Sequence, residues 1–411
     1  MKINDYNQKT KTLNLLILSM FFLGPMNFFI KQTNILYLDV FINSIFLCGL
    51  IFLYIINIDR KIEKDFLVIL FFFLITLFFS GIFYSSYLVN WVGLIVIFTL
   101  TTLPGYYIGR KITDTDHFFR LIEKVPFPLT VIMLVIFFYK KNLNILRLDD
   151  MFISYAILPS VIISTYLLLY KKKMVNIVYI LVGLFMIITH GSRGPLLAIL
   201  VYIILYFLIN ADKNKIIITF LSLSSLYIYF NFLTIVSWLI SVLNKFNYSS
   251  RTLYKIIDGS VTSGTGRDSI QEIALNLFKE HPFTGVGIGV ERIHIFEGIY
   301  LTRGVTDKLS TSYPHNIFIE LLAQFGLIGG LLIILFILFI IVKSFNSSNK
   351  NEKNLLIILF SITFIELMLS SSYLLSPQFF FYMGVCYSLV VRKRTKQSLL
   401  LREKTIDLQV N

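Results

Sequence analysis

Three short stretches of the sequence combine basic side chains with residues that interrupt helices. They are HGSRGP, SGTGRD and SYPHN, which contain Arg193, Arg267 and His315 respectively. A guanidinium group binds phosphate through a planar fork of donors, and an imidazole is the side chain that most readily exchanges a proton near neutral pH. These residue types together predict chemistry at a phosphate ester, on condition that the fold brings the three stretches to one place.

The first stretch predicts an anion site at a turn between two apolar segments. Arg193 lies in this turn between Ser192 and Gly194, which are expected as supporting residues. The glycines on both sides, Gly191 and Gly194, expose backbone N–H groups beside the guanidinium, which favours an anion site. A guanidinium at the membrane boundary is costly unless an anionic group meets it. The alternative is an arginine at a helix end whose charged head reaches the water.

The second stretch opens a helix that the sequence predicts over residues 267–280. Its apolar residues recur at i, i+3, i+4, i+7 and i+8 from Ile270, which describes a single stripe. Arg267 lies in the first turn, where a helix already attracts anions. The alternative is that Arg267 only forms an ion pair with Asp268 or Glu272.

The third stretch places a histidine where a hydrophilic segment meets a long apolar one. Pro314 ends the hydrophilic segment, and Asn316 and Glu320 follow His315 on one face of the next helix. We expect His315 to act as a general base, with Asn316 and Glu320 as supporting residues. The alternative is a polar residue that only completes the hydrogen bonding at the start of the helix.

The elements that must position these residues are membrane-spanning helices. Hydrophobic residues make up 56% of the 411 residues and charged residues only 15%, proportions that exclude an ordinary soluble protein. We therefore predict an all-α, polytopic membrane protein with about 12 transmembrane helices, the first of which is a retained signal anchor. The expected spans are 13–30, 35–56, 66–83, 88–109, 126–139, 152–170, 175–190, 195–210, 216–241, 316–342, 354–372 and 376–391.

The distribution of lysine and arginine predicts the orientation of these spans. With both termini in the cytoplasm, most of the 37 basic residues fall in cytoplasmic segments. The net charge of +14 then needs no nucleic acid to explain it. The predicted organisation is nine spans in residues 1–242, an extracytoplasmic loop at 243–313, three spans in 314–391, and a basic, disordered cytoplasmic tail at 392–411. Arg193, Arg267 and His315 all reach the outer face.

Four further features have interpretations of their own. The glycines of HPFTGVGIG follow a helix and open no βαβ unit, so they predict a turn or close backbone packing. Asp114 and Asp116 are interpreted as part of a solvated cytoplasmic loop, although their spacing also occurs in metal-binding pairs. Glu366 lies within a span, where a carboxylate is either functional or a neutral packing group. Cys48 and Cys386 both lie within spans, which makes a disulfide framework unexpected.

In order and spacing, these motifs resemble the O-antigen ligase and polymerase superfamily. The resemblance rests on the SRG turn, on GRD and HPFTGVGIG around the outer loop, and on PHNIFIE with the following GLIGG, from about residue 190 to residue 340. It implies a GT-C-like, cofactor-free and metal-independent glycosyltransferase at the outer face of the bacterial cytoplasmic membrane. Arg193 and Arg267 would hold the undecaprenyl diphosphate of the donor, and His315 would activate the acceptor hydroxyl.

Three functions agree with these residues. The proline of YPHN favours a polymerase of lipid-linked repeat units for O-antigen, capsule or exopolysaccharide, and an O-antigen ligase is the nearest alternative. A flippase for the same lipid-linked sugar is the alternative from a different class, but transporters usually have repeat symmetry and polar sites at the midplane. The expected partners are an undecaprenyl-diphosphate-linked glycan, the lipid bilayer and a chain-length regulator protein.

Overall fold

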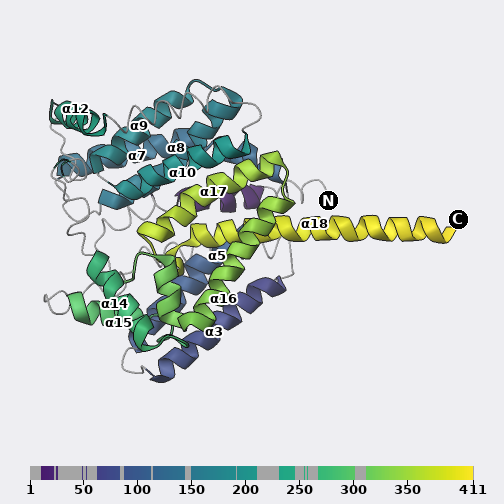
Figure 1. The fold of residues 1–411 in the computed structure, drawn as a ribbon. Helices are drawn as coiled ribbons and strands as arrows, with labels where there is room; N and C mark the ends of the chain where they lie inside the picture. Colours follow the sequence, from purple (N-terminus) through teal and green to yellow (C-terminus); the bar gives the residue numbers. More distant parts are fainter. Residues whose placement is uncertain are drawn as a thin grey trace.

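The computed structural model describes residues 11–22, 63–83, 88–112, 114–143, 150–190, 192–210, 231–245, 267–300 and 312–410, with a few single residues between these ranges. All regular elements in this part of the chain are helical, which confirms the all-α prediction (Figure 1). The expected span at 35–56 and the SGTG segment before Arg267 lie outside the described residues.

After a first helix at Lys11–Phe22, the labelled elements follow in chain order. They are α3 (Lys64–Phe83), α4 (Leu88–Ile97), η2 (Phe98–Thr102), α5 (Leu103–Arg110), α6 (Thr115–Ile122), α7 (Pro126–Leu143), α8 (Asp150–Lys171), α9 (Asn176–His190), α10 (Arg193–Ile209), α12 (Phe232–Lys245), α14 (Arg267–Glu280), α15 (Val290–Ile295), η4 (Phe296–Tyr300), α16 (Ile317–Ser347), α17 (Lys350–Leu369), η7 (Tyr373–Leu375) and α18 (Pro377–Val410).

Several of these helices have the length and composition of membrane spans. Three are long and apolar enough to cross a bilayer, at Thr115–Phe138, Met151–Lys171 and Ile317–Ser347. Shorter apolar helices occupy Lys11–Phe22, Asn176–His190 and Arg193–Ile209. The protein is therefore a membrane protein in its architecture, whereas the number of about 12 spans and the domain boundaries remain predictions.

Helix α17 and the first part of α18 lie in the middle of the molecule, and the rest of α18 projects away from the bundle to the C-terminus (Figure 1). Helices α7 to α10 pack on one side of them, and α3 and α16 lie on the other. Helices α14 and α15 pack against α16, and α17 packs against α10 and α8. Through these contacts α17 lies between the two parts of the chain that carry the basic stretches.

The closest helix crossing in the centre joins α5 to α18 and depends on small residues. A Cβ on Gly105 would lie 2.1 Å from the carbonyl oxygen of Pro377, and one on Gly109 would lie 2.1 Å from that of Phe381. On the opposite helix, a Cβ on Gly384 would lie 2.3 Å from the carbonyl oxygen of Tyr106. Glycines spaced by four residues let two membrane helices approach to backbone contact, which fixes α18 in the core.

Helix α16 is broken at Gly326, where the sequence predicts an uninterrupted span over 316–342. Gly326 has φ 63° and ψ −167°, a conformation that favours glycine. The break leaves backbone N–H and C=O groups on both sides without partners inside α16. The segment HPFTGVGIG before α15, called the glycine loop below, forms hydrogen bonds with them. Val286 N donates to Ala323 O at 2.9 Å, and Leu327 N donates to Pro282 O at 2.7 Å. The expectation of close backbone packing at HPFTGVGIG is therefore confirmed.

Two other expectations from the sequence are wrong. The tail beyond Arg392 is a continuation of α18 as far as Val410, because it contains no glycine or proline and is rich in strong helix formers. Asp114 and Asp116 are exposed, as expected, but they cap and begin helix α6 instead of lying in a loop. The Asp114 side chain caps this helix by accepting a hydrogen bond from the backbone N–H of His117 at 2.9 Å.

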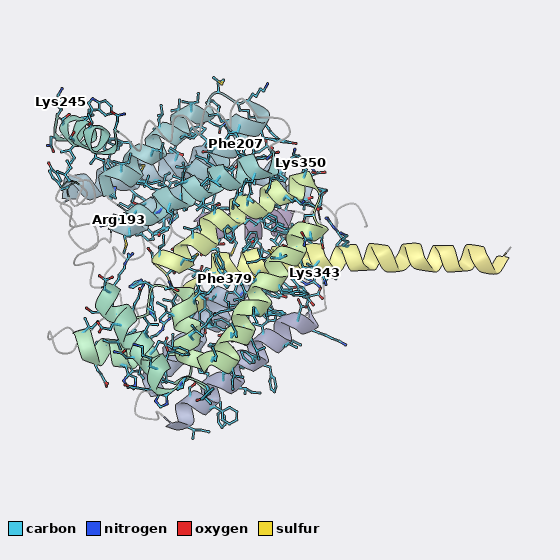
Figure 2. The ribbon with its side chains drawn as sticks, viewed as in Figure 1. Arg193, Phe207, Lys245, Lys343, Lys350 and Phe379 are labelled. Carbon is cyan, nitrogen blue, oxygen red and sulfur yellow. The ribbon has the colours of Figure 1, made fainter. Side chains whose placement is uncertain are left out.

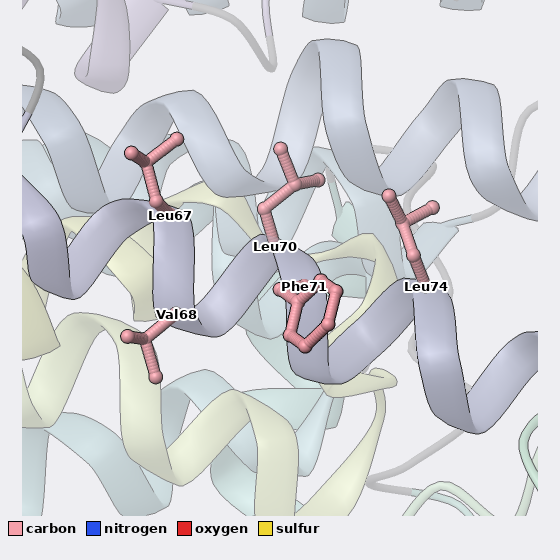
Figure 3. A pocket seen from close by; sticks show the side chains of 5 residues that line it. All are labelled: Leu67, Val68, Leu70, Phe71 and Leu74. Atoms are coloured by element: carbon pink, nitrogen blue, oxygen red, sulfur yellow. The ribbon is translucent and has the colours of Figure 1, made fainter.

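Helix α3 carries a shallow apolar groove of about 430 Å³ (Figure 3). Its lining residues all belong to α3 and are Leu67, Val68, Leu70, Phe71 and Leu74. None of these side chains can donate or accept a proton, so the groove has the character of a lipid-facing surface rather than of a reaction site.

Candidate active site

The C-terminal end of α17 binds two of the three basic residues that the sequence singles out. Arg267 donates from one Nη to Leu369 O at 2.8 Å, and His315 Nδ1 lies 3.1 Å from Ser370 O. The last carbonyl groups of a helix have no partner within it and carry partial negative charge. Two basic side chains from distant parts of the sequence therefore meet at one helix end.

The orientation of His315 fixes which nitrogen can act as a base. A carbonyl oxygen can only accept, so Nδ1 carries the proton in the bond to Ser370 O. In the neutral imidazole the lone pair is then on Nε2. Asn316 caps α16 directly behind it, because its side chain accepts from the backbone N–H groups of Phe318 and Ile319 at 3.0 and 3.3 Å. The first turn of α16 thus holds the histidine at the helix entrance.

Arg267 faces α17 and α8 rather than its own helix. Its second Nη lies 2.7 Å from the sulfur of Met151, the second residue of α8. The ion pair with Asp268 or Glu272 that the sequence leaves open is absent among the described residues. Two of the five guanidinium N–H groups make these contacts, which leaves the rest of the fork for an anion.

The SRG turn approaches the same end of α17 through Tyr155. The hydroxyl of Tyr155 occupies the space beside Gly194, since a Cβ on that glycine would lie 1.8 Å from it. The same hydroxyl donates to Ser370 Oγ at 2.9 Å. Ser192 is buried and precedes α10, so Arg193 is the first residue of that helix (Figure 2). The three basic stretches therefore converge around Ser370.

A buried charged cluster lies next to this site, and the sequence analysis missed most of it. Arg292 is 2% exposed and lies 3.5 Å from Glu320 Oε1 and 3.7 Å from Glu291 Oε1. Its Nη also donates to Ser372 Oγ at 2.7 Å, and Gln324 donates to Glu291 Oε1 at 2.7 Å. Glu320, expected as a supporting residue, thus faces an arginine that no motif contains.

The adjacent residues Glu291 and Arg292 follow the glycine loop in the sequence VERIHI, whose other residues are apolar except for His294. A charged pair in such a short apolar helix is the signal that could have pointed to a buried cluster. Their partners in α16 and after α17 are distant in sequence, so the pairing itself depends on the fold.

One carboxyl group of the cluster is expected to hold a proton at neutral pH. Burial, with the nearby Glu320 carboxylate, raises the pKa of Glu291 to about 8. Glu291 Oε2 and Glu320 Oε2 are buried without a hydrogen-bond partner among the described residues. One arginine cannot neutralise two buried carboxylates, so the favoured state is an ionised Arg292–Glu320 pair beside a neutral Glu291.

This assignment predicts that Glu291→Gln removes a pH-dependent loss of stability. Between about pH 4.5 and pH 8 folded Glu291 keeps a proton that the unfolded chain has lost, so the free energy of unfolding of the wild type falls by up to ~1.4 kcal/mol per pH unit. The variant should equal the wild type near pH 5 and exceed it increasingly towards pH 8. Thermal unfolding in detergent across this range measures the difference. Glu272→Gln, at an exposed site on α14, is the matched control, and parallel curves for wild type and Glu291→Gln would contradict the assignment.

Glu366 lies one turn before Ser370 and faces a small cavity of about 50 Å³. The polar groups that line this cavity with it are Tyr155, Thr363 and Gln378, and the remaining lining residues are apolar. Through Tyr155 the cavity adjoins the site around Ser370. Both interpretations of Glu366, as a functional group or as a packing group, agree with this position.

No three His, Cys, Asp or Glu side chains lie together as a metal site would require, within the part of the chain that the structure describes. The metal-free reaction that the resemblance implies stays a prediction.

Comparison with protein-family models identifies residues 177–334 as an O-antigen ligase domain. The comparison with curated proteins found no match. The matched segment runs from α9 into α16 and includes Arg193, Arg267, Arg292 and His315. This match supports the resemblance to the O-antigen ligase and polymerase superfamily that the motifs predict.

Proposed function

We propose that the protein is a glycosyltransferase that polymerises undecaprenyl-diphosphate-linked repeat units at the outer face of the cytoplasmic membrane. The observation that supports this most directly is the convergence of Arg267, His315 and the SRG turn at the C-terminal end of α17. The family match supports a polymerase or ligase role in O-antigen biosynthesis.

In this proposal the arginines bind the diphosphate of the donor. The free donors of Arg267 and the guanidinium of Arg193 would neutralise the oxygens on which charge develops as the bond to the anomeric carbon breaks. Fixed cations in a water-poor site are effective for this purpose because they need not reorganise during the reaction. The leaving group is undecaprenyl diphosphate, which takes the electron pair of the broken carbon–oxygen bond.

His315 would be the general base. Its Nε2 lone pair accepts the proton of an acceptor hydroxyl while the hydroxyl oxygen bonds to the anomeric carbon, and attack from the face opposite the diphosphate inverts that carbon. A base of this kind typically contributes about 10²–10⁴-fold to a rate. In a polymerase the acceptor is the next lipid-linked repeat unit, and a chain-length regulator is then a partner to be sought.

A ligase is the second candidate, since O-antigen ligase is the description of the matching family. The two reactions differ only in the acceptor, so the product separates them. In membranes from a deletion strain, the restored wild-type gene should produce a ladder of lengths still linked to the carrier lipid. Finished polymer that stays unattached in the deletion strain would instead show a ligase.

Product formation should also persist in the presence of a metal chelator. Strict dependence on added divalent metal would contradict the metal-free mechanism.

A further inference from the structure

His315 has a backbone conformation that needs support from its surroundings. Its φ angle is 56°, in the left-handed region that residues with a side chain adopt at an energetic cost. Such conformations persist only where neighbouring groups hold them in place, and they cluster at functional sites. The residues that hold His315 are therefore part of the question of how it acts.

Arg292 contacts both chain segments that form the hydrogen bond of His315. The guanidinium carbon lies 5.3 Å from the ring centre of Tyr313, and the Tyr313 ring lies 4.5 Å from the His315 ring. On the other side, Arg292 donates to Ser372 Oγ at 2.7 Å, two residues after Ser370. One buried side chain thus braces the histidine and the carbonyl group that orients it.

Arg292 is itself held by one carboxylate, that of Glu320, and by the neutral carboxyl group of Glu291. Glu320 lies in the first part of α16, accepts a hydrogen bond from Ser372 and pairs with Arg292 at 3.5 Å. Glu291 lies 3.7 Å away on the other side. A buried ion pair that loses one partner leaves an uncompensated charge, so this cluster resists movement. Its contacts connect the outer loop, the start of α16 and the end of α17.

We propose that Arg292, held by Glu320, is a positioning residue that keeps His315 Nδ1 on Ser370 O and so keeps the basic lone pair on Nε2. The effect of Arg292 on catalysis rests on the proposed function, whereas its effect on the orientation of the His315 ring does not. Arg292 touches Tyr313 and Ser372, not the reacting atoms, and acts through the orientation of the imidazole.

The test uses two conservative variants, because a larger change could prevent folding. Arg292→Lys keeps the charge that Glu320 requires but lacks the planar fork that reaches Ser372 and covers Tyr313. Ser372→Ala keeps Arg292 and removes the hydroxyl that it contacts after α17, together with the hydrogen bonds of that hydroxyl to Glu320 and to the backbone N–H of Leu374. The full-length protein is labelled with ¹⁵N-histidine and reconstituted in liposomes. Solid-state NMR then measures which ring nitrogen of His315 carries the proton, with the His315→Asn spectrum for assignment.

In the wild type we expect the tautomer protonated on Nδ1, and in both variants a mixture of tautomers. Turnover per folded molecule should fall about 10- to 100-fold, because a small misplacement of a catalytic group has a cost of this order. KM for the lipid-linked glycan should stay within about threefold of the wild-type value. The matched control is Arg110→Lys, which weakens a partly buried arginine pair with Asp65 away from this cluster. It should leave the His315 tautomer and turnover unchanged.

Folded Arg292→Lys and Ser372→Ala proteins that retain the wild-type tautomer would overturn the positioning role. A wild-type protein with no glycan transfer would instead defeat the proposed function, and the NMR result would still decide the role of Arg292. If the variants lose stability but the tautomer and turnover of the folded fraction are unchanged, Arg292 is only structural and the proposal is wrong.

Discussion

Loss of the imidazole of His315 is expected to lower glycan transfer by about 10²–10⁴-fold, the usual contribution of a general base. His315→Asn is the sharper variant, because asparagine tolerates a left-handed backbone and its side-chain amide can still donate to Ser370 O. It thereby keeps the conformation and the hydrogen bond, and removes only the base. Product formation in membranes, normalised to the amount of folded protein, measures the loss.

His315→Ala complements this variant. It removes the base and the hydrogen bond together, and alanine at φ 56° adds backbone strain. Both variants should insert into the membrane, and both should be inactive to a similar degree. Wild-type turnover in His315→Asn would exclude the imidazole as the base, whatever the alanine variant does.

The second large effect is expected at the two arginines. Arg193→Lys and Arg267→Lys keep the positive charge but lose the bidentate geometry that suits a diphosphate. We expect turnover to fall by about 10²-fold or more in each, the usual cost of removing one fixed donor to a developing negative charge. Initial rates with saturating lipid-linked glycan measure this effect directly.

Arg110→Lys serves again as the control, because Arg110 pairs with Asp65 at 3.0 Å, and none of its contacts among the described residues involves the site. Full turnover in both Arg193→Lys and Arg267→Lys would mean that neither guanidinium clamps the diphosphate. A loss in Arg267→Lys alone would remove Arg193 from the proposed diphosphate site and leave Arg267, at the start of α14, as the arginine that binds it.

Local patterns in the sequence predicted the parts of the site, but not how they meet. The amphipathic stripe from Ile270 predicts a helix over 267–280, and α14 occupies that range. The stripe cannot predict the hydrogen bond from Arg267 to Leu369 O, which joins residues 102 positions apart. Which carbonyl group accepts from Arg267 depends on where α17 ends in the folded protein.

Arg292 is a residue that the sequence did not single out but that the fold places at the centre of the buried cluster. It occupies no recognisable motif, and its importance arises only when α15, α16 and the segment after α17 come together. The helical tail illustrates a different error. Its basic residues suggested disorder, yet lysine, arginine, leucine and glutamine are all strong helix formers, and propensity prevailed over charge.

The length of α18 has a consequence for topology. This helix begins at Pro377, a few residues after Ser370, and its 34 residues extend about 51 Å to Val410. A hydrocarbon core is about 30 Å thick, so a single straight rod is long enough to separate its two ends by a whole bilayer. If α18 crosses the membrane as the sequence predicts, its two ends lie on opposite sides. A membrane-impermeant label applied from one side would then reach either the level of His315 or the end at Val410, but not both.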